Sequence, residues 1–147
     1  MSRHFVMRRP RSIATIAERT KARTQPFDMA VREFLDTWQS LSPDERETAL
    51  AGEPQTLGGV YDAYLAALSE HLALSDRTTA PAWTEDAKRF LSEPFFAGGL
   101  ESLKAILLVE SPLAFRRRLI FISANALSRP LRNSPMDEPV GAAKRDV

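Results

Sequence analysis

The chain has 147 residues, of which 44% are hydrophobic and none is cysteine, and its formal net charge is +1. This length suits one globular domain with a core of its own. The lack of cysteine excludes a disulfide framework, a thiolate zinc site and a cysteine nucleophile, and it fits a reducing cytoplasm. Apolar runs such as 105–109 and 119–122 are far shorter than the roughly 20 residues of a membrane-spanning helix, so no membrane segment is expected.

Charge is unevenly distributed along the chain. Residues 1–25 contain seven basic residues and one acidic residue, residues 26–110 contain six and fifteen, and residues 111–147 contain seven and three. Two basic ends therefore flank an acidic middle. Such a pattern attracts nucleic acid or an acidic partner, and it equally allows the ends to fold back on the middle.

The first 25 residues are predicted to form a flexible basic arm. Pro10 interrupts the segment, and Ile13, Ile16 and Ala17 make only a short apolar stripe. The segment lacks the apolar region of a secretory signal, and its resemblance to a mitochondrial transit peptide is the less favoured interpretation. A single helical domain is predicted over residues 26–129, followed by a disordered tail over residues 130–147 that has no periodicity.

Helical periodicity is clear from residue 27 onward. One apolar face of a helix collects Phe27, Val31, Phe34, Leu35, Trp38 and Leu41. Ser42, Pro43 and Glu45 then have the pattern of a capping box, which predicts a short helix that ends near Gly52 and Pro54. Both predictions rest on local signals.

Three further helices are predicted between residues 60 and 110. Gly58-Gly59 precedes a helix over residues 60–75, one side of which is apolar. The stretch from Pro81 to Leu91 is predicted to be helical, with Thr84 as its N-cap. Residues 100–110 have little polar face and are expected to form the central buried helix.

The last helix is predicted to begin at Ser111-Pro112. Residues 119–122 are rich in β-branched side chains, which also allows a short strand. Because no second strand candidate is found, helix is favoured there, and Ser123 is expected to cap a final turn. The predicted fold class is all-α, an irregular or orthogonal bundle of five to six helices.

Motifs for catalysis are mostly absent. Neither Gly58-Gly59 nor Gly98-Gly99 continues into a phosphate-binding loop. His71 is not part of an HExxH pattern and is expected at the surface or rim, and no serine-nucleophile or calcium-loop motif is present. We therefore expect no enzymatic activity, no metal and no cofactor.

Aromatic residues fall at helical or cap spacing, which favours core packing over a ligand cage. The expected core comprises ten side chains, namely Phe34, Trp38, Leu65, Leu68, Trp83, Phe90, Leu103, Ile106, Leu107 and Phe115.

Three consecutive arginines, Arg116 to Arg118, lie between Phe115 and the apolar run 119–122. On a helix they span about 200° at roughly 100° per residue, so they cannot all face one partner. Arg118 is predicted to point inward and to form a structural ion pair with a carboxylate such as Glu110 or Glu101.

The other arginines are predicted to form an outer basic edge. Its members are Arg116, Arg117, Arg129 and Arg132. This edge suits the acidic surface of a protein partner or the phosphates of nucleic acid, the latter with help from arginines in the arm. An enzymatic alternative requires a hidden site such as Glu110 with Arg117. Oligomeric state is left open.

The segments around Trp83 and around the arginine run resemble a family of small proteins of GC-rich bacteria. That family has the pattern W-T-x-x-x-x-R-F-L followed by L-V-E-x-P-x-A-F-R-R-R-x-I-F-V, and the resemblance covers about residues 28–129. The matching positions are Trp83, Thr84, Arg89, Phe90, Leu91, Val109, Glu110, Pro112, Ala114, Phe115, Arg116, Arg117, Arg118, Ile120 and Phe121. Ile122 replaces the last valine. Leu119 stands where Gly or Asn is more usual, which weakens the expectation of a turn after Arg118.

The resemblance implies a partner and not a reaction. Proteins of this family are encoded beside nucleotidyltransferase-like proteins, in arrangements that look like toxin–antitoxin pairs. We therefore expect a non-enzymatic, antitoxin-like interaction module in the cytoplasm, with a nucleotidyltransferase-like protein as its partner. The alternative is a nucleic-acid-binding autoregulator that uses the arm and residues 116–118.

Overall fold

A computed structural model describes residues 7–97, 110–123 and 126–128 of the chain. The α-helices are α1 (Ile13–Ala22), α2 (Phe27–Trp38), α3 (Pro43–Ala51), α4 (Tyr61–Ser75) and α6 (Leu113–Arg116). Two 3-10 turns, η1 (Ala82–Glu85) and η2 (Ala87–Arg89), and two short strands, β1 (Phe95–Phe96) and β2 (Ile120–Phe121), accompany them. The structure is mostly helical, which confirms the all-α class.

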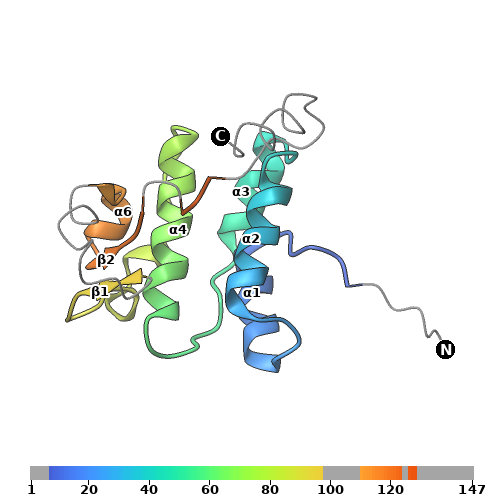
Figure 1. Cartoon of the computed structure of the whole chain (residues 1–147). Helices are drawn as coiled ribbons and strands as arrows, with labels where there is room; N and C mark the ends of the chain where they lie inside the picture. Colours follow the sequence, from blue (N-terminus) through green and yellow to red (C-terminus); the bar gives the residue numbers. More distant parts are fainter. Residues whose placement is uncertain (1–6, 98–109, 124–125, 129–147) are drawn as a thin grey trace, which may run out of the picture.

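Helix α4 lies at the centre of the arrangement (Figure 1). Helices α1, α2 and α3 lie on one side of it, and α6, β1 and β2 lie on the other. Buried residues occur on every side of α4, including the carboxylates Asp62 and Glu70. A buried charge requires partners inside the protein, so both carboxylates must be paired. The helix that was expected at the centre, over residues 100–110, lies almost wholly outside the described residues.

Residues 13–22 correct the prediction of a flexible arm, because they form helix α1 and pack on α2. Ser12 caps the helix by accepting a hydrogen bond from the backbone N–H of Thr15, and Ile13 and Ile16 are fully buried. Pro10 is also buried. The short apolar stripe is sufficient because it meets the strongly apolar face of α2, so the folded domain begins well before residue 26.

The three helices that had strong local signals agree with their predictions. Helix α2 begins at Phe27, and α4 covers residues 61–75. Ser42 and Glu45 form a complete capping box at the start of α3: the Ser42 hydroxyl accepts from the Glu45 N–H, and the Glu45 carboxylate accepts from the Ser42 N–H. Helix α3 ends at Ala51, next to Gly52.

Residues 81–91 form two 3-10 turns where one helix was predicted. Asp86 has an extended backbone (φ −62°, ψ 140°), and its side chain accepts from the N–H of Lys88. Such local hydrogen bonds compete with helix formation, which explains the break. Thr84 does not cap a helix, because its hydroxyl donates to the carbonyl of Pro81 at 2.7 Å.

Residues 120–121 form a strand, which corrects the helix that was favoured for residues 119–122. Strand β2 pairs in parallel with β1, so that Ile120 lies opposite Phe95 and Phe121 opposite Phe96. The partner strand has only two residues, too few for a recognisable alternation. Leu119 turns the chain into β2 with a left-handed φ of 64°, so the turn after Arg118 is present despite the leucine.

Ser111 fastens the two ends of this C-terminal segment together. Its hydroxyl donates to the carbonyl of Ile122 at 3.0 Å and accepts from the N–H of Ile122 at 2.8 Å. A helix was predicted to begin at Ser111-Pro112. Pro112 precedes the single helical turn of α6, and Ser111 connects the start of the segment to its end through hydrogen bonds.

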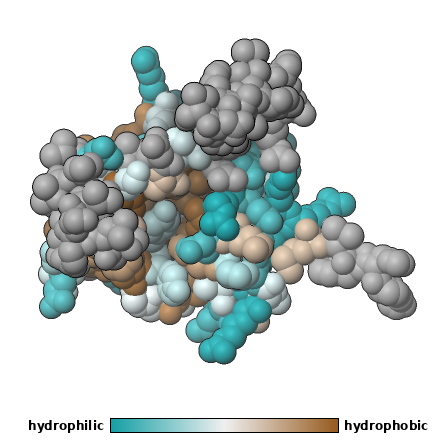
Figure 2. All heavy atoms as spheres, in the orientation of Figure 1, coloured by the Kyte–Doolittle hydropathy of each residue, from teal (hydrophilic) through white to brown (hydrophobic). Residues whose placement is uncertain are grey.

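Five of the expected core residues are buried, namely Phe34, Trp38, Leu65, Leu68 and Phe115. Trp83 and Phe90 are half-buried, and Leu103, Ile106 and Leu107 lie outside the described residues. Figure 2 shows hydrophobic residues in the middle of one face, around α4, and hydrophilic side chains projecting at its periphery. Among the described residues, no helix has the length and apolarity that crossing a membrane requires.

Candidate functional site

The three consecutive arginines have three different environments beside α4. Arg118 is fully buried, the side chain of Arg117 is 34% exposed, and Arg116 lies on the surface. The run leaves the single turn of α6 and continues through two more turn residues, so successive side chains point in different directions. Arg118 is the member that faces inward.

Arg118 connects three elements through its guanidinium group. Its Nη1 donates to the Glu70 carboxylate on α4 and, at 2.8 Å, to the carbonyl of Ala114 on α6. Its Nη2 donates to the carbonyl of Thr84 on η1 at 2.9 Å. The guanidinium carbon lies 4.5 Å from the centre of the Phe90 ring, close enough for a cation–π interaction.

Arg117 binds the same carboxylate from the solvent side. Its Nη1 lies 2.8 and 2.9 Å from the two oxygens of Glu70. Its Nη1 and Nη2 donate to the two oxygens of Glu85 at 3.1 and 3.0 Å. We call Glu70, Glu85, Arg117 and Arg118 the arginine cluster. It combines two cations with two carboxylates.

The electrostatics of the cluster stabilise its charged forms. The hydrogen bond from Arg117 holds the pKa of the Glu85 carboxyl below its ordinary value, and the hydrogen bond to Glu85 raises the pKa of Arg117. Glu85 is therefore ionised at neutral pH. The cluster binds η1 and the C-terminal segment to α4, which is a structural role.

The carboxylates that hold Arg118 differ from the prediction. They belong to Glu70 and Glu85, whereas Glu110 or Glu101 was expected. Glu110 lies on the surface, and Glu101 lies outside the described residues. The guanidinium group of Arg118 faces α4, where Glu70 is the buried acid that it contacts.

Of the predicted basic edge, the described part of the chain contains only Arg116 and Arg117. Arg116 is exposed, but Arg117 gives its guanidinium group to Glu70 and Glu85. Arg129 and Arg132 lie outside the described residues. The arginine that the enzymatic alternative paired with Glu110 is thus occupied by two other carboxylates.

A second buried arginine, Arg89, fastens the loop before α4. Its Nη2 donates to the carbonyl of Pro54 at 2.7 Å and to the Glu53 carboxylate at 3.2 Å, and its Nη1 lies 3.7 Å from Asp62. This bonding lowers the pKa of Glu53. The guanidinium carbon lies 4.9 Å from the centre of the Trp83 ring. Like Arg118, it is a structural group.

Sequence reasoning missed the acids of these buried sites. Glu70 lies four residues after Ala66 and three before Ala73, both of which are buried. Small residues at this spacing indicate that α4 packs closely on that side. A buried acid on that side of the helix requires a cationic partner, so the sequence itself indicated that Glu70 is paired. Nothing local indicated which arginine would reach it.

Two other groups near the core have displaced pKa values. Burial raises the pKa of Tyr64 to about 12, and burial lowers the pKa of His71. The rings of both residues pack against Phe115, with centres 5.2 and 6.3 Å away. Among the described residues, no group of three or more His, Cys, Asp or Glu side chains is arranged to hold a metal ion.

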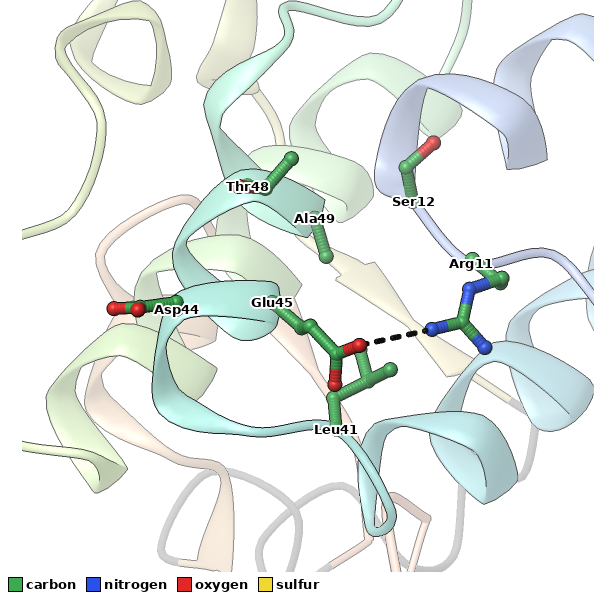
Figure 3. A pocket seen from close by; sticks show the side chains of 7 residues that line it. All are labelled: Arg11, Ser12, Leu41, Asp44, Glu45, Thr48 and Ala49. Atoms are coloured by element: carbon green, nitrogen blue, oxygen red, sulfur yellow. Dashed lines mark ion pairs between the residues drawn. The ribbon is translucent and has the colours of Figure 1, made fainter.

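Two clefts border helix α3. The smaller one, of about 380 Å³, lies between α3 and the segment that leads into α1 (Figure 3). Arg11 reaches across it to Glu45, with an Nη2–Oε2 distance of 3.6 Å. The capping hydrogen bond from the backbone of Ser42 holds the pKa of Glu45 below its ordinary value, so Glu45 is charged at neutral pH.

The larger cleft, of about 710 Å³, lies between α3 and the end of α4, and we call it the α3–α4 cleft. Its lining consists of Trp38, Pro43, Asp44, Arg46, Glu47, Leu50, Ala51, Asp76, Thr78, Thr79 and Pro81. Trp38 and Leu50 are almost fully buried and supply apolar surface, whereas Asp44 and Glu47 are exposed.

Comparison with known proteins adds no further guide to function. No family model, curated protein or solved structure matches the chain. The arginine cluster and the α3–α4 cleft are therefore the features from which we infer a function.

Proposed function

We propose that this chain is a non-enzymatic interaction module that binds a partner protein. The observation that carries the proposal is the α3–α4 cleft, which combines apolar surface with charged groups. Its lining contains no histidine, serine, lysine or tyrosine. Apolar surface beside exposed carboxylates suits the binding of a segment with complementary charge.

The state of the arginines supports the same proposal. Arg89, Arg117 and Arg118 are engaged by carboxylates and backbone carbonyls of the chain itself. They stabilise the fold and are not presented to a substrate. Interaction with a partner then falls to the clefts and to the exposed charges.

The partner that the family resemblance implies is a nucleotidyltransferase-like protein encoded beside this chain. In that case the module acts in the cytoplasm and restrains its partner, as an antitoxin does. Binding alone is sufficient for this role, since a module that covers an active site needs no chemistry of its own.

Co-expression of the chain with the product of the adjacent gene tests the proposal. We expect the two proteins to co-elute as a complex whose mass, measured by light scattering, is larger than that of either protein. An unrelated nucleotidyltransferase serves as the control and should elute separately. Separate elution of the adjacent product at micromolar concentration would contradict the proposal.

A nucleic-acid-binding autoregulator is the second candidate, and one observation favours it. Arg8 and Arg9 are exposed and form no ion pair within the described part of the chain, although the neighbouring Pro10 is buried. Two exposed arginines next to a buried residue are positioned to contact phosphate groups. If this candidate is correct, Arg8→Ala/Arg9→Ala weakens gel-shift binding to DNA from its own operon, and the salt dependence becomes shallower by roughly 0.9 per lost contact.

A further inference from the structure

The rim of the α3–α4 cleft carries unbalanced negative charge. Asp44 and Glu47 lie three residues apart on α3, so they share one face of the helix. Both are exposed, and neither forms an ion pair with another residue in the described part of the chain. The third acid of the cleft, Asp76, is already paired with Arg46.

Arg46 lines the cleft, but its guanidinium group is bonded to Trp38 and Asp76 and does not neutralise the charges of the rim. Its Nε and Nη2 donate to the carbonyl of Trp38 at 3.1 and 2.9 Å, and its Nη1 donates to the two oxygens of Asp76 at 2.9 and 3.2 Å. Its guanidinium carbon lies 4.7 Å from the centre of the Trp38 ring. Its donors are engaged in this way, and among the described residues Arg46 forms its ion pair with Asp76 and not with Asp44 or Glu47.

The neighbouring cleft shows that this acidic helix accepts an arginine from another segment. Arg11, which precedes α1, extends across that cleft to Glu45 (Figure 3). Asp44 borders both clefts. One side of the start of α3 is therefore occupied by a cation of the chain, and the other side presents carboxylates that lack one.

We propose that the α3–α4 cleft binds a basic segment of the partner protein. An arginine or lysine of that segment places its cationic group between Asp44 and Glu47, and its aliphatic stem packs toward Trp38 and Leu50. Long cationic side chains commonly bury their stems while the charge stays near water. The volume of about 710 Å³ lies within the range of about 300–1,000 Å³ typical of binding pockets.

This inference rests on the proposed function and adds the chemistry of the bound segment. Charge complementarity decides between occupants: the rim carboxylates repel phosphate groups, so nucleic acid is disfavoured here, and they attract a cation. A basic segment of a second copy of this chain has similar chemistry. Its binding would appear as self-association, which the experiment below measures.

Labelled nine-residue peptides test the cleft directly. Sets with randomised flanking positions carry Arg, Lys, Leu or Glu at the centre, and fluorescence anisotropy measures their binding to the full chain. We expect the Arg and Lys sets to bind most tightly and the Glu set to bind weakest. Binding of the Arg set should weaken as salt rises from 0.05 to 0.5 M, since the rim charges are exposed. Equal binding of all four sets would overturn the proposal.

Matched variants locate the binding site. Asp44→Asn/Glu47→Gln removes two rim charges and should weaken binding of the Arg set by roughly fivefold, as expected for two exposed ion pairs. Glu18→Gln/Glu93→Gln makes the same change of net charge at exposed residues that do not line the cleft, and it should leave the affinity unchanged. An equal loss in both variants would reject the cleft as the site.

Two further measurements separate this inference from the proposed function. In the complex with the adjacent gene product, the rim variant should weaken association while the control variant does not. Unchanged association would reject the cleft and leave the proposed function standing. Failure of that complex together with charge-selective peptide binding would reject the implied partner and retain the cleft. Light scattering that shows concentration-dependent self-association through the cleft would overturn the assignment to a partner protein.

Discussion

Arg118 is a fully buried cation, and Glu70 is the buried acid that it contacts directly. A guanidinium group loses several kcal/mol of hydration in a protein interior unless carboxylates and carbonyls replace the lost water. Glu70 supplies the buried carboxylate, while Ala114 and Thr84 supply carbonyls. Glu70 also binds Arg117, so removing this acid leaves Glu85, which is exposed, as the remaining carboxylate of the cluster.

Replacement of Glu70 by glutamine is therefore expected to lower the free energy of unfolding by about 3–5 kcal/mol, the usual effect of removing one partner of a buried ion pair. Arg116→Ala, an exposed neighbour in the same run, should change it by less than about 0.5 kcal/mol. Urea denaturation measures both. In a double-mutant cycle with Arg118→Met, coupling between Glu70 and Arg118 should exceed about 1 kcal/mol. Coupling near zero would refute the role given to the pair.

His71 should make stability depend on pH. Burial lowers its pKa in the folded state below the ordinary value of 6.5, so the unfolded state binds a proton more readily. Stability should then fall as pH drops below about 6.5, down to the pKa of the folded state. His71→Gln should flatten this dependence between pH 5 and 7 in thermal denaturation, whereas His4→Gln should preserve it. A steep dependence that survives His71→Gln would contradict the assignment.

At the scale of single elements, the turn at Leu119 stores backbone strain. A leucine at φ 64° lies in a region that costs a residue with a β-carbon roughly 1 kcal/mol, and Asn tolerates this region better than most residues. Leu119→Asn should therefore be more stable than Leu119→Ala by about 0.5 kcal/mol or more, although both remove a half-buried side chain. Denaturation by guanidinium chloride measures the difference in the free energy of unfolding between the two variants. A less stable Asn variant would mean that strain is relieved elsewhere.

Secondary-structure elements were predicted correctly where the sequence signal is local. The predictions failed where an element depends on residues distant in the sequence. The capping box of α3 and the apolar face of α2 involve neighbours in sequence, and both were correct. Helix α1 was missed because Ile13 and Ile16 gain stability from α2 and not from their own segment. Strand β2 was missed because its partner has only two residues.

The same distinction applies to the arginine cluster. Helical spacing predicted that one arginine of the run faces inward, and the structure places Arg118 there. The acid that it meets lies 48 residues earlier in the chain. No pattern near residue 118 contains that information, and the prediction of Glu110 or Glu101 was wrong. The acidic rim of the cleft was not predicted either, because the sequence indicates only that Asp44 and Glu47 lie on the solvent-facing side of a short helix.

For the molecule as a whole, α4 is the element on which the others assemble. It contacts α6, η1 and η2, and it lies beside the group formed by α1, α2 and α3 (Figure 1). Backbone amides of such a central helix open only when the whole domain unfolds. Hydrogen exchange followed by mass spectrometry should show the slowest exchange in residues 65–73. Slower exchange in α1 or α3 would place the most stable part of the domain elsewhere.

The separation between Glu70 and Arg118 has a consequence during synthesis on the ribosome. At about 5–20 residues per second, roughly 2 to 10 s pass between translation of the acid and of the cation 48 residues later. Helix α4 thus leaves the exit tunnel with Glu70 on a surface that will later be buried. The contacts that cover this surface form only after the last third of the chain has been synthesised. Nascent chains that stall before residue 117 should be preferred substrates for chaperones and proteases.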